Sequence, residues 1–322
     1  MFKIDILRKR LIGLKTRIVF GPEEIDLAKD EVIVLCLVKN GATYIDEFIK
    51  HYFLLGVKHI VFLDNNSTDQ TIEKIKKYNN VTVLWTDSPF GHDNDMRMRE
   101  YLIERFALGK WSLSVDIDEF FDYPYSDKIK LKSLIKYLES NSFTAVVSHM
   151  LDMFPGAIYR NENNFLIKKH KYYTLSSLSK TEYYFENGKK PETKIRLMTG
   201  GIRKKIFNLN SYLIKHALIF SDDNTKRGRS GHTLACGKIA DLSSVLYHYK
   251  FVGQFFDYAE DAAKREFQSN QSSDYKFYNK VFLNKDFLLL KDADSIWIDN
   301  VNELVDKDFL VVSDNFKNFA NV

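Results

Sequence analysis

The sequence has few of the features that identify secreted, membrane-spanning or nucleic-acid-binding proteins. Its 322 residues include only two cysteines, Cys36 and Cys236, which are too few for a disulfide framework and are expected to be reduced. No apolar run approaches the roughly 20 residues of a transmembrane helix, and the N-terminus lacks the apolar core of a signal peptide. The net charge of +4 is too mildly basic to indicate nucleic-acid binding. These absences predict a cytoplasmic protein.

Two common nucleotide-binding motifs are also missing. No G-x-G-x-x-G follows the first apolar run, and no G-x-x-x-x-G-K-[ST] occurs anywhere in the chain. Dinucleotide-binding and P-loop proteins need these glycine loops because their backbone approaches the phosphates closely. The chain also lacks internal repeats and long linkers, and 45% of its residues are hydrophobic. It is therefore expected to form one large domain, or a domain with an appendage.

From residue 31 onward, apolar runs alternate with segments of helical periodicity. The predicted strands cover residues 32–38, 59–63, 81–85 and 111–115. The predicted helices between them cover residues 44–55, 67–78 and 96–107, and Ser67 with Gln70 fits a capping box for the second helix. This alternation predicts a three-layer α/β fold with a mostly parallel central sheet. In such sheets, ligands bind beyond the carboxyl ends of the strands.

Three carboxylates follow the fourth predicted strand, in the sequence WSLSVDIDEFFD. Asp116, Asp118 and Glu119 lie beside apolar residues, where neighbouring carboxylates repel one another and resist desolvation. A bound cation would neutralise them, and oxygen ligands on a short loop favour Mg²⁺ or Mn²⁺. The alternative is an acidic turn that caps a helix beginning near Phe120. Because Asp64 follows the second predicted strand, it is expected to share a cleft with the three carboxylates.

Several short motifs occur in a fixed order between residues 32 and 250. The main segments are VKNGATYIDEFIKHYFLLGVKHIVFLDNNSTDQT and WSLSVDIDEFF, and they are followed by GGIRKKIF, SGH and LYHYK. These motifs resemble the family 2-like glycosyltransferases, especially the bacterial branch related to the family 92 enzymes. Gly41 stands where that branch usually has glutamate, so no side-chain role is carried over to this position.

The resemblance implies a GT-A fold, a nucleotide-sugar donor and a divalent metal, Mn²⁺ or Mg²⁺. It implies contacts with the nucleotide for Val38, Lys39, Asp64, Asp116 and Arg99, with Arg97 as the alternative to Arg99. Asp118 is implied as the direct metal ligand, Asp116 as a ligand of the ribose or of a metal-bound water, and Glu119 as a supporting residue. Arg203 in GGIRKK is expected to contact the phosphates or an anionic acceptor. The alternative for that segment is a solvated turn before a strand.

The C-terminal half is expected to supply one further metal ligand, because this fold commonly uses a histidine there. His248 in LYHYKF is the first candidate and His232 the second, although a lone histidine can equally be structural. The resemblance also implies an inverting reaction, which needs a general base. The acidic candidates for that base are Asp152, Asp222, Asp223 and Glu192.

The two ends of the chain differ from the predicted 31–250 glycosyltransferase domain. Residues 1–30 begin with lysines and arginines at helical spacing among leucines and isoleucines, which predicts a basic amphipathic segment. It would either contact the inner membrane or pack on the domain. Residues 251–322 predict a helical appendage, with helices near 254–267 and 275–290 and an acidic tail, which could support self-association.

Taken together, the residues and the resemblance predict a metal-dependent glycosyltransferase, and the resemblance implies that it is an inverting one. A UDP-sugar is the favoured donor, and the acceptor is a glycan or lipid-linked glycan in bacterial capsule or lipopolysaccharide synthesis. One alternative is a nucleotidyltransferase, which would need a basic nucleotide-binding loop near the first strand. The other is a non-catalytic module that binds glycans or membranes.

Overall fold

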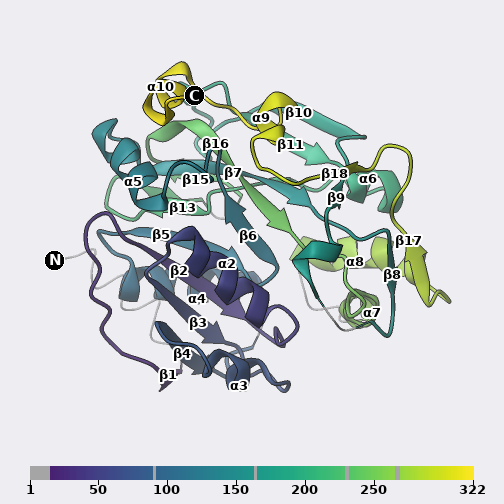
Figure 1. Cartoon of the computed structure of the whole chain (residues 1–322). Coiled ribbons are helices and arrows are strands. Elements are labelled where there is room, and N and C mark those ends of the chain that lie inside the picture. Colours follow the sequence, from purple (N-terminus) through teal and green to yellow (C-terminus); the bar gives the residue numbers. More distant parts are fainter. Residues whose placement is uncertain (1–14, 90–91, 163–164, 229–231, 265–268) are drawn as a thin grey trace.

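The computed structural model describes residues 15–89, 92–162, 165–228, 232–264 and 269–322, and a single sheet forms its centre (Figure 1). The strands of this sheet are β1 (Thr16–Phe20), β2 (Val32–Val38), β3 (His59–Asp64), β4 (Val81–Thr86), β5 (Trp111–Asp116), β6 (Glu119–Asp122), β7 (Ala145–Asp152), β12 (Ile214–Lys215), β13 (Leu218–Phe220) and β16 (Ile239–His248). Among the described residues the sheet has 10 strands in the order β1-β4-β3-β2-β5-β13-β7-β16-β6, and β12 pairs with β7.

The centre of the sheet is parallel and its flanks are mixed. Strands β4, β3, β2 and β5 are parallel neighbours, whereas β1 is antiparallel to β4. Strand β13 runs antiparallel between β5 and β7, β16 is parallel to β7, and β6 is antiparallel to β16. The continuous apolar sequence of β2, VIVLCLV, suits a strand covered on both faces, and all seven residues are buried.

Helices cover both faces of the parallel strands. They are α2 (Ile45–Leu55), α3 (Thr71–Ile75), α4 (His92–Phe106) and α5 (Leu131–Ser140). On one face, Val34 and Cys36 of β2 belong to a core that includes residues of α2 and α5. On the other face, Leu35 and Leu37 pack with Met98 and other residues of α4. This alternation confirms the predicted three-layer α/β fold.

Two local predictions from the sequence are wrong. Residues 16–20 form the edge strand β1 rather than part of the N-terminal amphipathic helix, while residues 1–14, which carry the rest of that prediction, lie outside the described residues. The capping box before α3 does not form, because the N-cap residue Gln70 makes no side-chain cap bond. Ser67 instead links two loops: its Oγ accepts a hydrogen bond from the Asn40 N–H at 2.8 Å, and its N–H donates to Asp64 at 3.0 Å.

The second half of the chain adds short paired strands and further helices. They are β8 (Ala157–Tyr159), a 3₁₀ helix (Ile167–Lys169), β9 (Tyr172–Tyr173), β10 (Leu178–Glu182), β11 (Arg196–Gly200), α6 (Ile202–Phe207), β14 (Lys226–Arg227), β15 (Leu234–Cys236), α7 (Phe255–Lys264), α8 (Ser269–Phe282), β17 (Phe287–Leu289), β18 (Ile296–Trp297), α9 (Glu303–Asp306) and α10 (Asp314–Ala320). Residues 200–207 therefore contain helix α6 and not the solvated turn before a strand.

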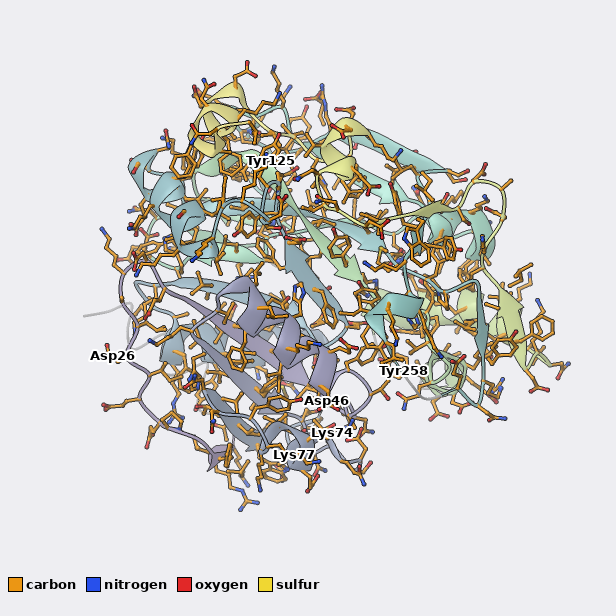
Figure 2. All side chains as sticks on the ribbon, viewed as in Figure 1. Asp26, Asp46, Lys74, Lys77, Tyr125 and Tyr258 are labelled. Carbon is orange, nitrogen blue, oxygen red and sulfur yellow. The ribbon has the colours of Figure 1, made fainter. Side chains whose placement is uncertain are left out.

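The C-terminal segment is partly helical and packs against earlier parts of the chain. Helix α8 ends at Phe282, earlier than predicted, and β17 and β18 pair with β8 and β9. Tyr125, labelled in Figure 2, stacks on Phe316 of α10 with ring centroids 6.3 Å apart. The division at residue 250 stays a prediction. No helix in the described parts of the chain combines the length and the apolar character needed to cross a membrane.

Candidate functional site

Three strand ends bring the predicted nucleotide-binding residues together at one edge of the sheet. The β2–β3 register sets Val38 opposite Asp64, and the β2–β5 register sets Leu37 opposite Asp116. Parallel neighbours end at the same edge, so Asp64 and Asp116 lie on either side of the end of β2. Lys39, the next residue after β2, is exposed at this edge.

Asp64 is fully buried, and only one of its carboxylate oxygens is satisfied. Its Oδ2 accepts the hydrogen bond from the Ser67 N–H, whereas its Oδ1 has no partner among the described residues. Burial raises the pKa of Asp64, and the contacts with Ser67 oppose that rise. A buried acceptor without a donor is unfavourable. A ligand that brings an N–H or O–H group to Asp64 would remove this penalty.

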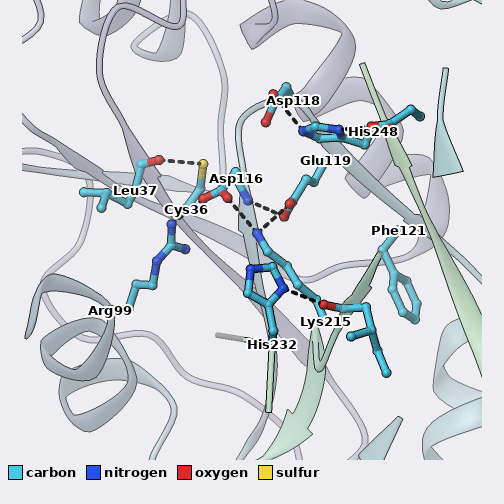
Figure 3. Close-up of polar contacts among 12 residues, drawn as sticks. Cys36, Leu37, Arg99, Asp116, Asp118, Glu119, Phe121, Lys215, His232 and His248 are labelled. Atoms are coloured by element: carbon cyan, nitrogen blue, oxygen red, sulfur yellow. Dashed lines mark hydrogen bonds and ion pairs between the residues drawn. The ribbon is translucent and has the colours of Figure 1, made fainter. Parts of the chain in front are cut away.

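Two basic side chains neutralise Asp116 and Glu119 of the acidic loop, residues 116–119 (Figure 3). Lys215 Nζ donates hydrogen bonds to Asp116 Oδ2 at 2.7 Å and to Glu119 Oε1 at 2.5 Å, and Arg99 of α4 donates to Asp116 Oδ1. Burial by itself raises the pKa of Asp116, but the charges of Arg99 and Lys215 hold it far below its usual range. The protein itself therefore supplies cations to this loop, and carboxylate repulsion alone does not call for a metal.

The backbone around Glu119 fixes the shape of the loop. Glu119 Oε2 accepts a hydrogen bond from the Asp116 N–H at 2.9 Å, and the Tyr52 hydroxyl donates to the Glu119 carbonyl at 2.8 Å. Glu119 begins strand β6, so the alternative of a helix beginning near Phe120 is wrong. Glu119 therefore links the two ends of the loop through its side chain, and its carbonyl joins the loop to Tyr52 of α2.

Asp118 has a different partner, the imidazole of His248. His248 Nε2 lies 3.3 Å from Asp118 Oδ2, and His248 Nδ1 lies 2.6 Å from Asp152 Oδ1. Strand register explains the arrangement, because His248 at the end of β16 pairs with Asp152 at the end of β7 and with Glu119 of β6. Burial lowers the pKa of His248, but Asp118 and Asp152 together raise it above its usual value.

Arg203 of α6 completes this arrangement. Its Nε and Nη2 donate to the two oxygens of Asp152 at 2.8 and 2.7 Å, and Nη2 also lies 2.9 Å from His248 Nδ1. Because the Asp152 contact is the shortest made by His248, we assign the Nδ1 proton to a hydrogen bond with Asp152. In the charged ring that the two carboxylates favour, Nε2 also carries a proton toward Asp118, and binding of a cation at Nε2 would require the loss of that proton. Gly201 precedes the helix at φ 63°, which a residue with a side chain rarely adopts, and so permits the turn that introduces Arg203.

Asp118 and His248 could together provide two ligands of a divalent cation, whose other ligands would be waters or substrate oxygens. Metal-binding histidines usually donate their other ring N–H to a carboxylate, as His248 does to Asp152. Within the described residues no group of three or more His, Cys, Asp or Glu side chains could hold a metal. Two protein ligands suit Mg²⁺ or Mn²⁺, which commonly retain waters and bind substrate phosphates.

Other predicted residues lie away from this pair. Arg97 is exposed on α4, whereas Arg99 turns toward Asp116. His232 Nδ1 lies 2.7 Å from the Ile214 carbonyl, and burial lowers the pKa of His232 to about 4. Its polar partner is therefore a backbone group on the strand of Lys215, and the structure does not join it to Asp118.

The structure does not support the candidate general bases. Asp222 and Asp223 follow β13, which runs antiparallel to β5 and pairs Phe220 with Trp111. They therefore lie beyond the amino end of β5, about 17 Å from its carboxyl end for a strand of 6 residues. Asp152 is held by Arg203 and His248, and these partners overcome burial to lower its pKa. Glu192 is exposed, with no described contact to the site.

Lys215 is the main residue of the site that the sequence interpretation missed. The only local signal is a lysine within the apolar segment LIKHALIF, and such a lysine is rarely buried unless it is paired. Its carboxylate partners lie 96 and 99 residues earlier in the chain. Only the pairing of β12 with β7 and of β13 with β5 brings them together.

Comparisons with known proteins give only distant similarities. No protein-family model matches the chain, and no curated protein matches it. TarS from S. aureus is 15% identical over 79% of this chain and 71% of that chain, with a TM-score of 0.36. The mannosyltransferase PcManGT from Pyrobaculum calidifontis, in complex with GDP-Man and Mn²⁺, is 19% identical over 46% and 43%, with a TM-score of 0.30. HddC from Yersinia pseudotuberculosis is 10% identical over 59% and 76%, also with a TM-score of 0.30. Similarities this weak carry no conclusion about activity.

Proposed function

We propose that this protein is a glycosyltransferase that uses a nucleotide-sugar donor and a divalent metal. The observation that carries the proposal is the Asp118–His248 pair, in which Asp152 orients the imidazole through its other nitrogen. The pair lies next to the carboxyl end of β5, where ligands bind in parallel α/β sheets.

The adjacent strand ends supply the groups that a nucleotide would need. The free Oδ1 of Asp64 is an acceptor for a base N–H, and Val38 offers an apolar contact beside it. Asp116 can accept from a ribose hydroxyl while Arg99 and Lys215 keep it ionised. A nucleotide in this position would extend from Asp64 across the end of β2 toward Asp118.

Sugar transfer breaks the bond between the anomeric carbon and the diphosphate, so negative charge grows on the leaving group. A divalent cation held by Asp118 and His248 would supply positive charge for that group when bound. Asp152 and Arg203 fix the orientation of His248, so the two ligands need little rearrangement.

The finer parts of the proposal rest on the family resemblance. They are a UDP-sugar as donor, inversion at the anomeric carbon, and a glycan or lipid-linked acceptor in capsule or lipopolysaccharide synthesis. The nucleotidyltransferase alternative shares the acidic edge, and the two activities differ in their products. A glycosyltransferase releases a nucleoside diphosphate, whereas a nucleotidyltransferase releases pyrophosphate.

The test is calorimetric titration with UDP, GDP, CDP and ADP, each with and without Mn²⁺. It is performed on the natural protein, on Asp118→Ala, and on Asp314→Asn as a control, because the Asp314 side chain is 95% exposed on the C-terminal helix. We expect one diphosphate to bind at least about tenfold more tightly with Mn²⁺, and Asp118→Ala to abolish that gain.

Two results would contradict the proposal. One is the absence of binding by all four diphosphates in the presence of Mn²⁺. The other is a metal-dependent gain that is the same in Asp118→Ala as in Asp314→Asn, which would place the metal elsewhere.

A further inference from the structure

Arg227 is a partly buried arginine that has no counterion among the described residues. It lies in β14, which pairs with β15 in an antiparallel hairpin. Its Nε and Nη2 atoms are buried, and neither has a hydrogen-bond partner among the described residues. The described residues likewise provide no carboxylate in an ion pair with it. Other parts of the residue remain accessible, because Arg227 as a whole is only partly buried.

The other buried arginines of the site differ from Arg227 in this respect. Arg99 donates to Asp116, and Arg203 donates to both oxygens of Asp152. Burial alone would lower the pKa of both arginines, but these carboxylates raise it above the usual range. Burial and then the nearby charge of Arg99 instead lower the pKa of Arg227 to about 10. The local environment thus disfavours the charged form of Arg227.

The surroundings of Arg227 are basic. Its charge and that of Arg99 affect each other, and it also lowers the pKa of His216 beyond the larger effect of burial. His216 Nε2 lies 2.8 Å from the Tyr183 hydroxyl, whereas its Nδ1 is buried without a partner in the described structure. Arg227 and His216 therefore both carry buried nitrogens without a partner among the described residues.

Arg227 differs from the two cations that are paired with the loop. Arg99 and Lys215 contact Asp116 or Glu119, whereas the buried Nε and Nη2 of Arg227 have no acceptor among the described residues. An uncompensated buried charge is strongly unfavourable, and a guanidinium fork matches two oxygens of one anionic group. A bound anion would satisfy the free Nε and Nη2 in this way.

We propose that Arg227 binds a phosphate group of a substrate, where the identity of that substrate rests on the proposed glycosyltransferase function. The phosphate belongs either to the diphosphate of the donor or to a phosphorylated acceptor. The same guanidinium would serve either source, so the ligands used in the test must separate them.

The experiment measures binding of inorganic pyrophosphate, UDP, uridine and glycerol phosphate by calorimetry. Pyrophosphate is titrated without divalent metal, so that this result does not depend on the Asp118–His248 pair. The variants are Arg227→Met and, as a matched control, Arg17→Met, which makes the same change at an exposed arginine lying over Trp85. Arg227→Lys keeps the positive charge but lacks the two parallel N–H donors of the guanidinium. It replaces Arg227→Met in the titrations if the methionine variant does not fold.

We expect Arg227→Met to weaken pyrophosphate binding about tenfold or more, while Arg17→Met leaves it unchanged. A parallel loss for UDP with uridine unaffected assigns the phosphate to the donor. A loss for glycerol phosphate with UDP unaffected assigns it to the acceptor. Without ligand, Arg227→Met should melt at the same temperature as the natural protein or higher, because the substitution removes an unpaired buried charge.

The inference is overturned if Arg227→Met binds pyrophosphate, UDP and glycerol phosphate as tightly as Arg17→Met does. It is also overturned if the natural protein binds none of them. If the proposed function is wrong, the titrations give a different set of results. In that case no nucleoside diphosphate binds in a metal-dependent manner, while the effect of Arg227→Met on pyrophosphate persists.

Discussion

Replacing Lys215 with methionine should destabilise the protein by leaving two carboxylates without their shared cation. The Lys215 side chain is 15% exposed and Glu119 is 1% exposed, so water cannot solvate Glu119 once the ammonium is gone. Removing one partner of a buried ion pair typically costs about 3–5 kcal/mol of unfolding free energy. We expect about 3 kcal/mol, because Asp116 is more exposed and still has Arg99.

The assay is urea-induced unfolding at pH 7 in a double-mutant cycle with Glu119→Gln. Glutamine can still accept from the Asp116 N–H but carries no charge. In the Lys215→Met background it should therefore recover about 1 kcal/mol or more, whereas alone it should destabilise. Lys204→Met is the control, because Lys204 is exposed and its Nζ donates to Asn208, a neutral side chain. Equal stability of Lys215→Met and Lys204→Met would refute the conclusion that protein cations neutralise the acidic loop.

Two further predictions concern His149, which is buried in the core, and Asp152, which contacts the ring of His248. His149 has no hydrogen-bond partner for either nitrogen among the described residues, and burial lowers its pKa to about 3. The neutral form is therefore favoured in the folded state, so stability is lost as the pH falls below about 6.5, at up to about 1.4 kcal/mol per pH unit. His149→Phe should reduce the difference between urea midpoints at pH 7 and pH 5, and an unchanged difference would contradict this. Asp152→Asn should weaken Mn²⁺-dependent nucleotide binding about tenfold, while nucleotide binding without metal stays the same. A loss in both conditions would indicate a general disruption and not a role in orienting His248.

The sequence was sufficient to predict features that depend on neighbouring residues. The apolar run 32–38 has the length and composition of a strand buried on both faces, and it became β2 with those bounds. Asp116 and Asp118 could be placed at a strand end because the apolar run stops just before them. Periodicity depends on neighbouring residues, so it can be recognised without knowing how the rest of the chain folds.

Features that depend on strand direction and register could not be predicted in this way. Asp222 and Asp223 were expected near the acceptor, but the antiparallel direction of β13 carries them to the opposite end of β5. The pairing of β12 with β7 and of β13 with β5 brings Lys215 to carboxylates 96 and 99 residues earlier. The pairing of β16 with β6 and β7 brings His248 to the same loop. No local pattern in the sequence encodes which strand lies beside which.

The departure at Gly41 has a physical explanation that the sequence did not provide. A Cβ atom at this position would lie 2.6 Å from Val38 Cγ2 and 3.1 Å from Ile117 Cγ1, which is closer than side chains normally pack. The loop after β2 therefore packs directly on the residue between Asp116 and Asp118. Glycine at this position keeps the two loops in contact.

The two aspartates of the D-x-D sequence have different environments, and this difference bears on how a metal would bind. Asp116 is held by Arg99 and Lys215, so adding a cation there would require displacing one of them. Within the described part of the chain, Asp118 is paired with the imidazole of His248, whose other nitrogen contacts Asp152. A divalent cation between Asp118 and His248 would therefore leave the ion pairs of Asp116 intact. In the proposed function, Asp118 then serves as the ligand, and Asp116 positions the nucleotide and holds the loop.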